Sequence, residues 1–303
     1  MSALATLDAD LLRSFPLPHL PEDGDKEERG RLLIVGGSRE VPGAALLAAT
    51  GGMRAGAGKL QIATAASIAI PLGLAVPEAR VVGCEETAEG CLGMGAVAPV
   101  LELVEDAQAV TIGCGLRHGD ALDDLLDALF ASGHDSPLVL DAAVLGSLPR
   151  RAEALRAWAA GAILLPHSRE MARLLECEAE EVEIDPLLAA KRAAEHYKAV
   201  ALIKGRYSFV AAPDGRAFRF EGGGIGLATS GSGDVLAGIV GGLAARGADP
   251  LTATLWGVWL HGEAGRMLTR KVGRVGFLAR EIADLVPGLL GDPPLFGDPS
   301  PLR

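Results

Sequence analysis

The stretch GLATSGSGDVLAGIV, residues 226–240, places a single acid, Asp234, between a glycine-rich turn and a run that is almost wholly apolar. Such a pattern is typical of a helix N-terminus, where a serine or aspartate side chain caps free backbone amides. Capping alone does not explain why six glycines fall within a dozen residues, since glycine costs conformational entropy on folding. Backbone that has to wrap an anion is one reason to tolerate them.

A second interpretation of this turn is an anion hole. The amides of Gly231, Ser232 and Gly233, at the positive end of a helix dipole, would bind phosphate oxygens. Asp234 would stand beside the phosphate, kept ionised by the same dipole, as general base for a hydroxyl that attacks it. The stretch therefore predicts either a plain helix cap or a phosphoryl-transfer site with Asp234 as its catalytic residue.

Upstream of this turn, strand and helix patterns alternate. RLLIVGG has the pattern of a buried strand, PGAALLAATGGMRAGAG of a small-residue helix and KLQIAT of a second strand, which together make a βαβ unit. The alternation continues along the chain and is interrupted by one hairpin that turns at PDG. Further strands are expected at residues 109–115, 137–145, 161–168 and 200–205, the hairpin at 207–222, and helices at 120–132, 168–177, 185–197, 233–247 and 250–270.

These elements predict an α/β fold, a three-layer α/β/α sandwich around a mostly parallel central sheet. Residues 1–30 are expected to form an N-terminal extension with a short helix near 7–15, residues 31–290 a single domain, and residues 291–303 a loose tail. In such folds, ligands bind beyond the carboxyl ends of the strands. Five segments follow expected strands and should share that edge: VGGS, IGCG, LDAA, LPHS and IKGR.

The charge balance limits the classes of ligand. In 303 residues, 39 acids outnumber 28 lysines and arginines for a net charge of −11, so nucleic acid is not an expected partner. A pocket can still bind a small phosphate ligand through amides and a few cations. Four scattered cysteines predict neither a zinc site nor a disulfide framework. We recognise no signal peptide and no membrane-spanning run, and expect a cytoplasmic protein.

Two common nucleotide-binding motifs do not fit this sequence. The loop GGSREVPG lacks the G-x-G-x-x-G spacing of a dinucleotide fold, and MRAGAGKL has Met53 and Leu60 where a P-loop needs glycine and serine or threonine. GSGD does not match the G-x-S-x-G pattern of a hydrolase nucleophile. A phosphate site would therefore depend on the turn before Asp234.

The segment GLATSGSGDVLAGIVGGL resembles the anion-hole motif of ribokinase-like enzymes. Within that superfamily, the chain is most similar to the NAD(P)H-hydrate dehydratases, which repair damaged nicotinamide cofactors, over residues 11–285. The long first block and PHSRE distinguish this family from vitamin and sugar kinases of the same fold. The blocks that carry the resemblance are GGSREVPGAALLAATGGMRAGAGKL, IGCGL, LVLDAAVL, ILLPHSREMARLL, ALIKGRYSFVAAPDG and GVWLHGEAGRML.

This resemblance implies a ribokinase-like catalytic domain that uses ADP or ATP with Mg²⁺. A nucleotide phosphoryl group is transferred to the hydroxyl of hydrated NADH or NADPH, (6S)-NADHX or (6S)-NADPHX, and phosphate is then eliminated. The logic is that hydroxide is a poor leaving group and phosphate a good one. Asp234 becomes the base for the hydroxyl proton, and the amides around Gly231 to Asp234 stabilise charge on the phosphoryl group. Stand-alone bacterial relatives favour ADP as donor.

The resemblance also implies roles for individual positions. Ala45, Gly115, His167 and Asp234 correspond to substrate-contact positions, and Glu170 to an acid that organises Mg²⁺ through water. The residues for which it implies nucleotide contacts are Lys204, Gly205, Arg206, Tyr207, Ser208 and Gly233.

Each of these positions has a structural interpretation as well. His167 follows a buried strand, where a histidine is often an ordinary structural residue, and Glu170 can be a first-turn helix acid. Ala45 and Gly115 can serve packing alone. Arg206 and Tyr207 can each belong to a solvated loop that follows the strand.

Four further side chains are informative. Asp141 ends a buried strand, where an unpaired carboxylate is costly, so we expect it to be hydrogen-bonded near the metal or the sheet end. His261 is expected to pack on the last but one helix. Arg54 and Lys59 face either phosphate or solvent.

The chain departs from the family pattern at three places. Ser168 and Arg169 stand where the family usually has Pro-Gly, Ala143 where a second acid is often found, and Cys114 where proline is common. The first departure adds bulk and a cation beside the expected site and leaves its backbone geometry open.

Two rival functions remain at this stage. A ribokinase-like small-molecule kinase for a hydroxymethyl vitamin precursor would keep Asp234 and the glycine turn, although the first block and PHSRE argue against it. A nucleotide-binding regulatory protein without catalysis would not need Asp234. The residues before the first strand are too few for the epimerase domain that relatives often carry, so a separate epimerase protein is expected. The family also implies a homotetramer.

Overall fold

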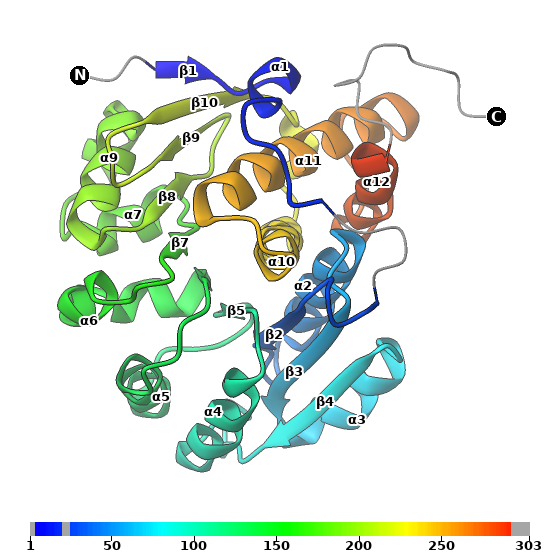
Figure 1. The fold of residues 1–303 in the computed structure, drawn as a ribbon, viewed down its shortest axis with the longest axis vertical. Coiled ribbons are helices and arrows are strands. Elements are labelled where there is room, and N and C mark those ends of the chain that lie inside the picture. The colour runs from blue at the N-terminus through cyan, green and yellow to red at the C-terminus, as the bar shows by residue number, and fades with distance from the viewer. Residues whose placement is uncertain (1–3, 20–24, 292–303) are drawn as a thin grey trace.

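A ten-stranded sheet runs through the middle of the computed structural model, which describes residues 4–19 and 25–291 (Figure 1). Its order is β1-β10-β9-β8-β7-β6-β5-β2-β3-β4, and only β9 runs antiparallel to its neighbours, so the expected mostly parallel sheet is confirmed. The strands are β1 (Leu4–Thr6), β2 (Arg31–Val35), β3 (Lys59–Ala65), β4 (Ala79–Cys84), β5 (Ala109–Ile112), β6 (Leu138–Leu140), β7 (Ala162–Leu164), β8 (Val200–Ile203), β9 (Tyr207–Ala211) and β10 (Ala217–Glu221).

Helices cover both faces of the sheet and complete the expected three layers (Figure 1). The helices are α1 (Ala9–Leu12), α2 (Pro42–Arg54), α3 (Ala66–Ala75), α4 (Val97–Glu105), α5 (Asp120–Ala131), α6 (Ala152–Arg156), α7 (Ser168–Leu174), α8 (Ala179–Ile184), α9 (Pro186–Tyr197), α10 (Ser232–Ala245), α11 (Pro250–Lys271) and α12 (Ala279–Gly291). Short 3₁₀ turns lie at Met94–Ala96, Ala142–Ser147, Pro149–Arg151 and Ile225–Leu227. Within the described ranges, no helix has the length and apolar character that crossing a membrane requires.

The central strands are buried on both faces, which explains their continuous apolar sequence. In β2, Leu32 and Ile34 pack in the core with α2, α10, α11 and α12, while Leu33 and Val35 pack in the second core with α4, α5, α7 and α9. All four side chains are fully buried. Parallel strands covered by helices on both sides have this composition.

Helices α2 and α10 approach each other backbone to backbone. A Cβ atom added at Gly238 of α10 would collide with the carbonyl oxygen of Ala48, and one added at Gly51 of α2 would collide with the carbonyl oxygen of Val235. Glycine and alanine at these positions therefore permit the contact, and the contact sets where the Asp234 end of α10 lies.

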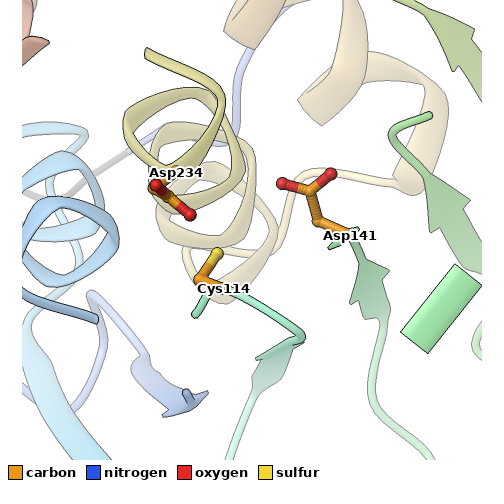
Figure 2. A group of neighbouring side chains, drawn as sticks. All are labelled: Cys114, Asp141 and Asp234. Atoms are coloured by element: carbon orange, nitrogen blue, oxygen red, sulfur yellow. The ribbon is translucent and has the colours of Figure 1, made fainter. Parts of the chain in front are cut away.

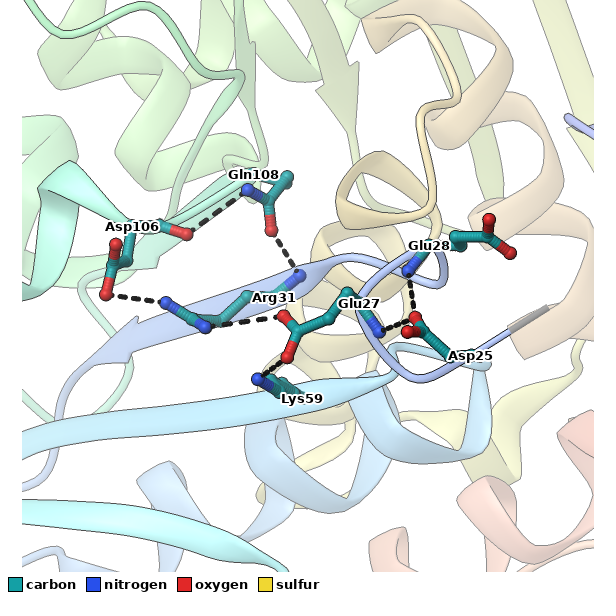
Figure 3. A network of polar contacts seen from close by, with 7 residues as sticks. All are labelled: Asp25, Glu27, Glu28, Arg31, Lys59, Asp106 and Gln108. Atoms are coloured by element: carbon teal, nitrogen blue, oxygen red, sulfur yellow. Dashed lines mark hydrogen bonds and ion pairs between the residues drawn. The ribbon is translucent and has the colours of Figure 1, made fainter.

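A polar network fixes the amino ends of β2 and β3 (Figure 3). The expected site lies at the opposite, carboxyl ends of the strands. Arg31 at the start of β2 lies 2.7 Å from Asp106 and 3.5 Å from Glu27, and its backbone amide donates to Gln108. Lys59 at the start of β3 also pairs with Glu27. Lys59 therefore ties the segment before β2 to the sheet instead of facing phosphate.

Arg54 has a comparable structural partner. It lies in the last turn of α2, and its guanidinium is 3.0 Å from the carboxylate of Asp284 on α12. The structure therefore places both Arg54 and Lys59 in ion pairs outside the expected phosphate site.

Several elements were not expected from the sequence. β1 adds a parallel edge strand beside β10, so the N-terminal segment takes part in the sheet. α1 occupies only four residues of the helix expected at 7–15. α3, β4, α4, α6, α8 and α12 were also not anticipated. The expected loose tail, 291–303, begins at the last residue of α12. The rest of that tail lies outside the described residues.

Candidate active site

The carboxyl ends of four neighbouring strands and the N-terminus of α10 meet at one edge of the sheet. Cys114 follows β5, Asp141 follows β6, His167 follows β7 and Lys204 follows β8. Asp234 lies in the first turn of α10, and its carboxylate faces Cys114 and Asp141 (Figure 2). The strand-end segments singled out in the sequence thus share one edge, as expected for this class of fold.

Lys204 is paired across the sheet with Asp141. Its ammonium Nζ lies 2.9 Å from Asp141 Oδ1, and the Asp141 side chain is only 5% exposed. Burial works against the charged form of Lys204, but Asp141, through its charge and its hydrogen bond, together with Glu170 and Cys114, raises the pKa of the lysine. A Cβ atom at Gly233 would lie 3.4 Å from this ammonium. The cation therefore lies between Asp141 and the turn that begins α10.

The environment of Asp234 makes it a stronger base than an ordinary aspartate. Burial, followed by the charge of Asp141, raises the pKa of Asp234 to about 6, while a hydrogen bond from the Cys114 thiol and the charge of Lys204 act in the opposite direction. Burial also raises the pKa of Cys114, which keeps it a thiol. The sequence predicted that the helix dipole keeps Asp234 ionised, but burial has the larger effect and raises its pKa. A pKa close to the working pH suits a general base.

The turn before Asp234 offers free donors to an anion. Gly231 begins α10 with φ +87°, a left-handed conformation that favours glycine. The amide of Ser232 is already used, since it donates to the carbonyl of Thr229 at 3.2 Å. Among the described residues, none accepts from the amides of Gly231, Gly233 or Asp234. The amides of Gly231, Gly233 and Asp234 are therefore the backbone donors available to a ligand at this turn, and the amide of Ser232 is not.

Most of the other glycines in this stretch have packing roles. A Cβ atom at Gly226 would collide with the ring of Phe277, and one at Gly223 would collide with Leu227. Of the glycines that crowd this stretch, Gly233 is the one whose added Cβ would face Lys204. The crowding that suggested an anion-wrapping loop therefore reflects close packing beneath the site as well.

A cavity of about 1070 Å³ adjoins this turn, between the β9–β10 hairpin, α10 and α11. This volume suits a nucleotide-sized ligand. Of the residues singled out in the sequence, it is lined by His167, Lys204, Gly205, Arg206, Ser208, Ser232 and Gly233. Lining residues without a distinctive sequence signal include Phe220, Leu227, Thr229, Val258, Thr269 and Arg274.

Tyr207 lies apart from this cavity. Its side chain is 42% exposed, and the guanidinium groups of Arg206 and Arg219 lie 5.6 Å and 5.5 Å from the ring centroid. The ring thus stacks with cations at the surface, so a nucleotide contact by Tyr207 would have to come from its backbone.

Ala45 and Gly115 lie together on the other side of the strand ends. An added Cβ at Gly37 would lie 3.2 Å from Ala45, and one at Gly115 would lie 3.3 Å from Gly37 and 2.8 Å from the carbonyl of Val41. Gly115 has φ +70°, so a side chain there would be strained as well as crowded. Both positions require small residues, and neither lines the large cavity.

His167 and Glu170 form a capping box at the start of α7. Nδ1 of His167 accepts from the amides of Arg169 and Glu170, and the Glu170 carboxylate accepts from the His167 amide at 2.9 Å. Nδ1 therefore carries no hydrogen, which leaves the ring proton on Nε2. The helix begins regularly at Ser168, so the departure from the family's Pro-Gly does not disturb the backbone.

His261 is the functional candidate that sequence reasoning underestimated. The structure places this buried residue against Ser232 and in the wall of the cavity. Burial lowers its pKa to about 4, so the ring is neutral at neutral pH. A histidine three turns into an apolar helix gave no signal of this position in the sequence.

Comparison of the sequence with known families gives an extensive match. The sequence profile described as NAD(P)H-hydrate dehydratase matches residues 32–288. The ADP-dependent (S)-NAD(P)H-hydrate dehydratase of Xanthomonas campestris pv. campestris is 47% identical over 287 residues, which cover 94% of this chain and 96% of that protein. The resemblance noted in the sequence is therefore confirmed.

Two solved structures show the same fold. A ribokinase-like superfamily protein of Enterococcus faecalis matches with a TM-score of 0.81, 25% identity and coverage of 95% of both chains. The ADP/ATP-dependent NAD(P)H-hydrate dehydratase of Bacillus subtilis, co-crystallized with ATP/Mg²⁺, matches with a TM-score of 0.79 and 27% identity, over 95% of this chain and 98% of the other. The ribokinase-like architecture is thus confirmed.

Proposed function

The chain belongs to the NAD(P)H-hydrate dehydratase family, and we propose that it uses ADP or ATP to dehydrate (6S)-NADHX and (6S)-NADPHX to NADH and NADPH. The observation that carries this proposal is the position of Asp234. Asp234 directly follows Gly233, whose amide is free and which lies beside the Lys204 ammonium in the wall of a cavity large enough for a nucleotide. A base, an anion site and a nucleotide pocket are the parts that phosphoryl transfer to a hydroxyl requires.

The first step is phosphoryl transfer. Asp234 takes the proton of the substrate hydroxyl, whose oxygen bonds to the terminal phosphorus of the nucleotide while the bond from that phosphorus to the leaving nucleotide breaks. The free amides of Gly231, Gly233 and Asp234 and the Lys204 ammonium stabilise charge on the transferring group.

The second step is elimination. Phosphate leaves from one ring carbon with its bonding electrons, and the neighbouring carbon loses a proton, which the departing phosphate accepts. The electron pair of that C–H bond forms the carbon–carbon double bond of the reduced nicotinamide. Phosphorylation is needed because hydroxide would be a much poorer leaving group, so the overall reaction is that of a carbon–oxygen lyase.

The carboxylates at the strand ends fit a Mg²⁺ ion. Carboxylate oxygens and waters are the ligands that Mg²⁺ prefers. Both oxygens of Glu170 already face His167, at 2.9 Å from its amide and 3.4 Å from Nε2, so Glu170 suits contact through water. Asp141 and Glu170 both act on the charge of Lys204, and these two carboxylates would contact a hydrated ion through its waters. When bound, Mg²⁺ neutralises charge on the nucleotide phosphates.

Ligand contacts are divided between the two sides of the strand ends. We assign the nucleotide to the large cavity, with Lys204, Gly205, Arg206, Ser208 and Gly233 in its wall. The backbone of Tyr207 completes this run. The hydrated nicotinamide is assigned to the region of Ala45 and Gly115, outside the cavity, and His167, which lines the cavity, is assigned to its contact with the substrate where the two ligands meet. This division brings the hydroxyl and the phosphorus together at Asp234.

A homotetramer in the cytoplasm is the proposed working form. The exposed face of α3 supports assembly, because this helix, ASIAIPLGLA, has no charged residue and leaves Ile70 78% and Leu74 79% exposed. Exposed apolar surface of this kind is typical of interfaces. A separate epimerase protein is also proposed, since an enzyme that acts on the S epimer alone leaves the other epimer unrepaired.

The decisive experiment follows absorbance of the reduced nicotinamide. Purified protein is mixed with NADHX, Mg²⁺ and either ADP or ATP, and formation of NADH is recorded. An absorbance increase with one nucleotide that is absent from Asp234→Asn supports the proposal and identifies the donor. Folded protein that gives no increase with either nucleotide contradicts it and points to a kinase for a hydroxymethyl substrate, whose product would be a stable phosphate ester.

A further inference from the structure

His261 contacts Ser232, the first residue of α10 and part of the anion-binding turn, at two points. Its Nε2 lies 2.9 Å from the hydroxyl oxygen of Ser232 and 3.0 Å from the carbonyl oxygen of the same residue. The two residues lie on different helices, α11 and α10, and both line the large cavity. Their exposed fractions are 9% and 5%, so water competes little for these contacts.

The chemistry of the two oxygens decides which ring nitrogen carries the proton. A carbonyl oxygen can only accept a hydrogen bond, so the contact at 3.0 Å requires a hydrogen on Nε2. Nδ1 is then unprotonated, because burial lowers the pKa of His261 to about 4 and keeps the ring neutral. No described residue is hydrogen-bonded to Nδ1, as expected for the tautomer with hydrogen on Nε2.

This tautomer frees the hydroxyl hydrogen of Ser232. The Ser232 oxygen shares the Nε2 hydrogen as an acceptor, so its own hydrogen is not used by His261. The Ser232 amide, by contrast, is used by Thr229. Since no other partner of the hydroxyl lies among the described residues, its hydrogen is available to a ligand in the cavity that Ser232 lines.

We propose that His261 is a positioning residue that directs the Ser232 hydroxyl to donate to the transferring phosphoryl group. The Ser232 hydroxyl thereby joins the free amides of Gly233 and Asp234 as a donor that strengthens as charge develops. His261 itself acts through Ser232 and not on the substrate. This inference rests on the proposed function, since it assigns a role in the phosphoryl-transfer step.

Two substitutions of His261 distinguish the effect of the hydrogen bond from Nε2 from the effect of side-chain size. The amide nitrogen of glutamine can occupy the position of Nε2 and donate, whereas the shorter asparagine reaches only as far as Nδ1. We expect His261→Asn to lower kcat about 100-fold, the scale of losing one oxyanion donor, with the Kd of the nucleotide nearly unchanged. His261→Gln is expected to recover most of that loss.

Ser232 supplies the second half of the test. Ser232→Ala is expected to lower kcat by a similar factor, and Ser232→Thr, which keeps the hydroxyl, by much less. Because both residues act through one hydrogen bond, His261→Asn added to Ser232→Ala should lower kcat little further. Equal losses in His261→Asn and His261→Gln, or losses that multiply in the double variant, would overturn the proposal.

A measurement on the wild-type protein covers the case in which a variant does not fold. Histidine labelled with ¹⁵N reports which ring nitrogen carries hydrogen, and the His261 resonance is identified through its covalent connection to the assigned backbone of the wild-type protein. The proposal requires hydrogen on Nε2 in the nucleotide complex, and hydrogen on Nδ1 refutes it. Wild-type protein that fails to dehydrate NADHX refutes the proposed function instead, whereas full activity in His261→Asn refutes this inference alone.

Discussion

The ammonium of Lys204 lies 2.9 Å from the carboxylate of Asp141, although the strand that precedes Lys204 and the strand that precedes Asp141 are separated by β7. The same ammonium lies beside Gly233 in the turn at the start of α10. One cation therefore neutralises a buried acid and faces the site for an incoming phosphate. Mutations can separate the role of Lys204 in stability from its role in phosphate binding.

Removing the cation should damage both stability and activity. In Lys204→Met, the buried carboxylate of Asp141 loses its partner, and the free energy of unfolding is expected to fall by about 3–5 kcal/mol. The double variant Lys204→Met/Asp141→Asn removes the unpaired charge and should regain most of that stability. Its activity should stay low because no cation faces the phosphate. Chemical denaturation and NADH formation measure the two effects, and recovery of activity in the double variant would argue against a phosphate contact by Lys204.

Asp234→Asn should lower kcat by about 10²–10⁴, the usual contribution of a general base. Asp284→Asn, at an exposed acid on α12, is the matched control and should leave kcat unchanged. Nucleotide binding, measured by calorimetry, should survive in both variants. Retention of normal kcat in Asp234→Asn would exclude this residue as the base.

Asp234→Asn, which lowers activity, should raise the stability of the protein at higher pH. The pKa of Asp234 is about 6 in the folded protein against 3.8 ordinarily, so the folded state favours the protonated acid. This contribution is complete below pH 3.8 and is lost as the pH rises through about 6. Asp234→Asn cannot ionise, so its Tm relative to that of the wild type should rise as the pH increases from 3.8 to about 6 and should then level off. A constant Tm difference over that interval would show that Asp234 titrates normally.

The acid limb of the kcat/KM profile should depend on Cys114. A hydrogen bond from the thiol lowers the pKa of Asp234, so Cys114→Ala is expected to move the limb, near pH 6, to higher pH. Cys114→Ser keeps a donor and should leave the limb close to its original position. Identical profiles for the two variants would mean that the thiol does not donate to Asp234.

The exposed face of α3 can be tested with charge. Ile70→Glu should shift the protein to smaller species in mass photometry, because an acid in an apolar interface is costly to bury. Ile184→Glu is the control, since Ile184 is 84% exposed on α8 within an acidic segment. Dissociation in both variants or in neither would place the interface elsewhere.

Sequence patterns predicted the elements that form the centre of the fold. β2, β3, β5, β7 and β8 are short apolar runs bounded by glycine or polar residues, and α11 follows a clear cap at Asp249. α10 follows Gly231 and has no side-chain cap, so the plain-cap interpretation of this turn is wrong. β1 could not be predicted, because three residues gain strand structure only by pairing with β10. α3 has apolar residues on all sides and an internal proline, Pro71, so it shows no helical period.

The site was predictable as a location but not as a set of contacts. Strand ends placed His167, Asp141 and Lys204 at one edge, since parallel strands finish together. The pairing of Lys204 with Asp141 depends on side-chain length across an intervening strand, which no sequence spacing encodes. The contact of His261 with Ser232 depends on how two helices cross.

The backbone contact between α2 and α10 can be tested directly. Gly238→Ala should lower the free energy of unfolding by about 1–3 kcal/mol, because its methyl group would collide with the backbone of Ala48. Gly288→Ala, in a helix with open space around the position, should instead be neutral or stabilising. Urea denaturation compares the two, and equal effects would mean that α2 and α10 can separate at little cost.

That contact also limits how the enzyme can work. Glycine at Gly51 and Gly238 brings the two backbones into contact, so α10 has no room to move toward α2 at these positions. We therefore expect the start of α10 to keep its place when ligands bind, so that the nucleotide and the damaged cofactor come to the base. Movement that admits or releases a nucleotide is then expected on the hairpin side of the cavity, whose wall includes no residue of α2.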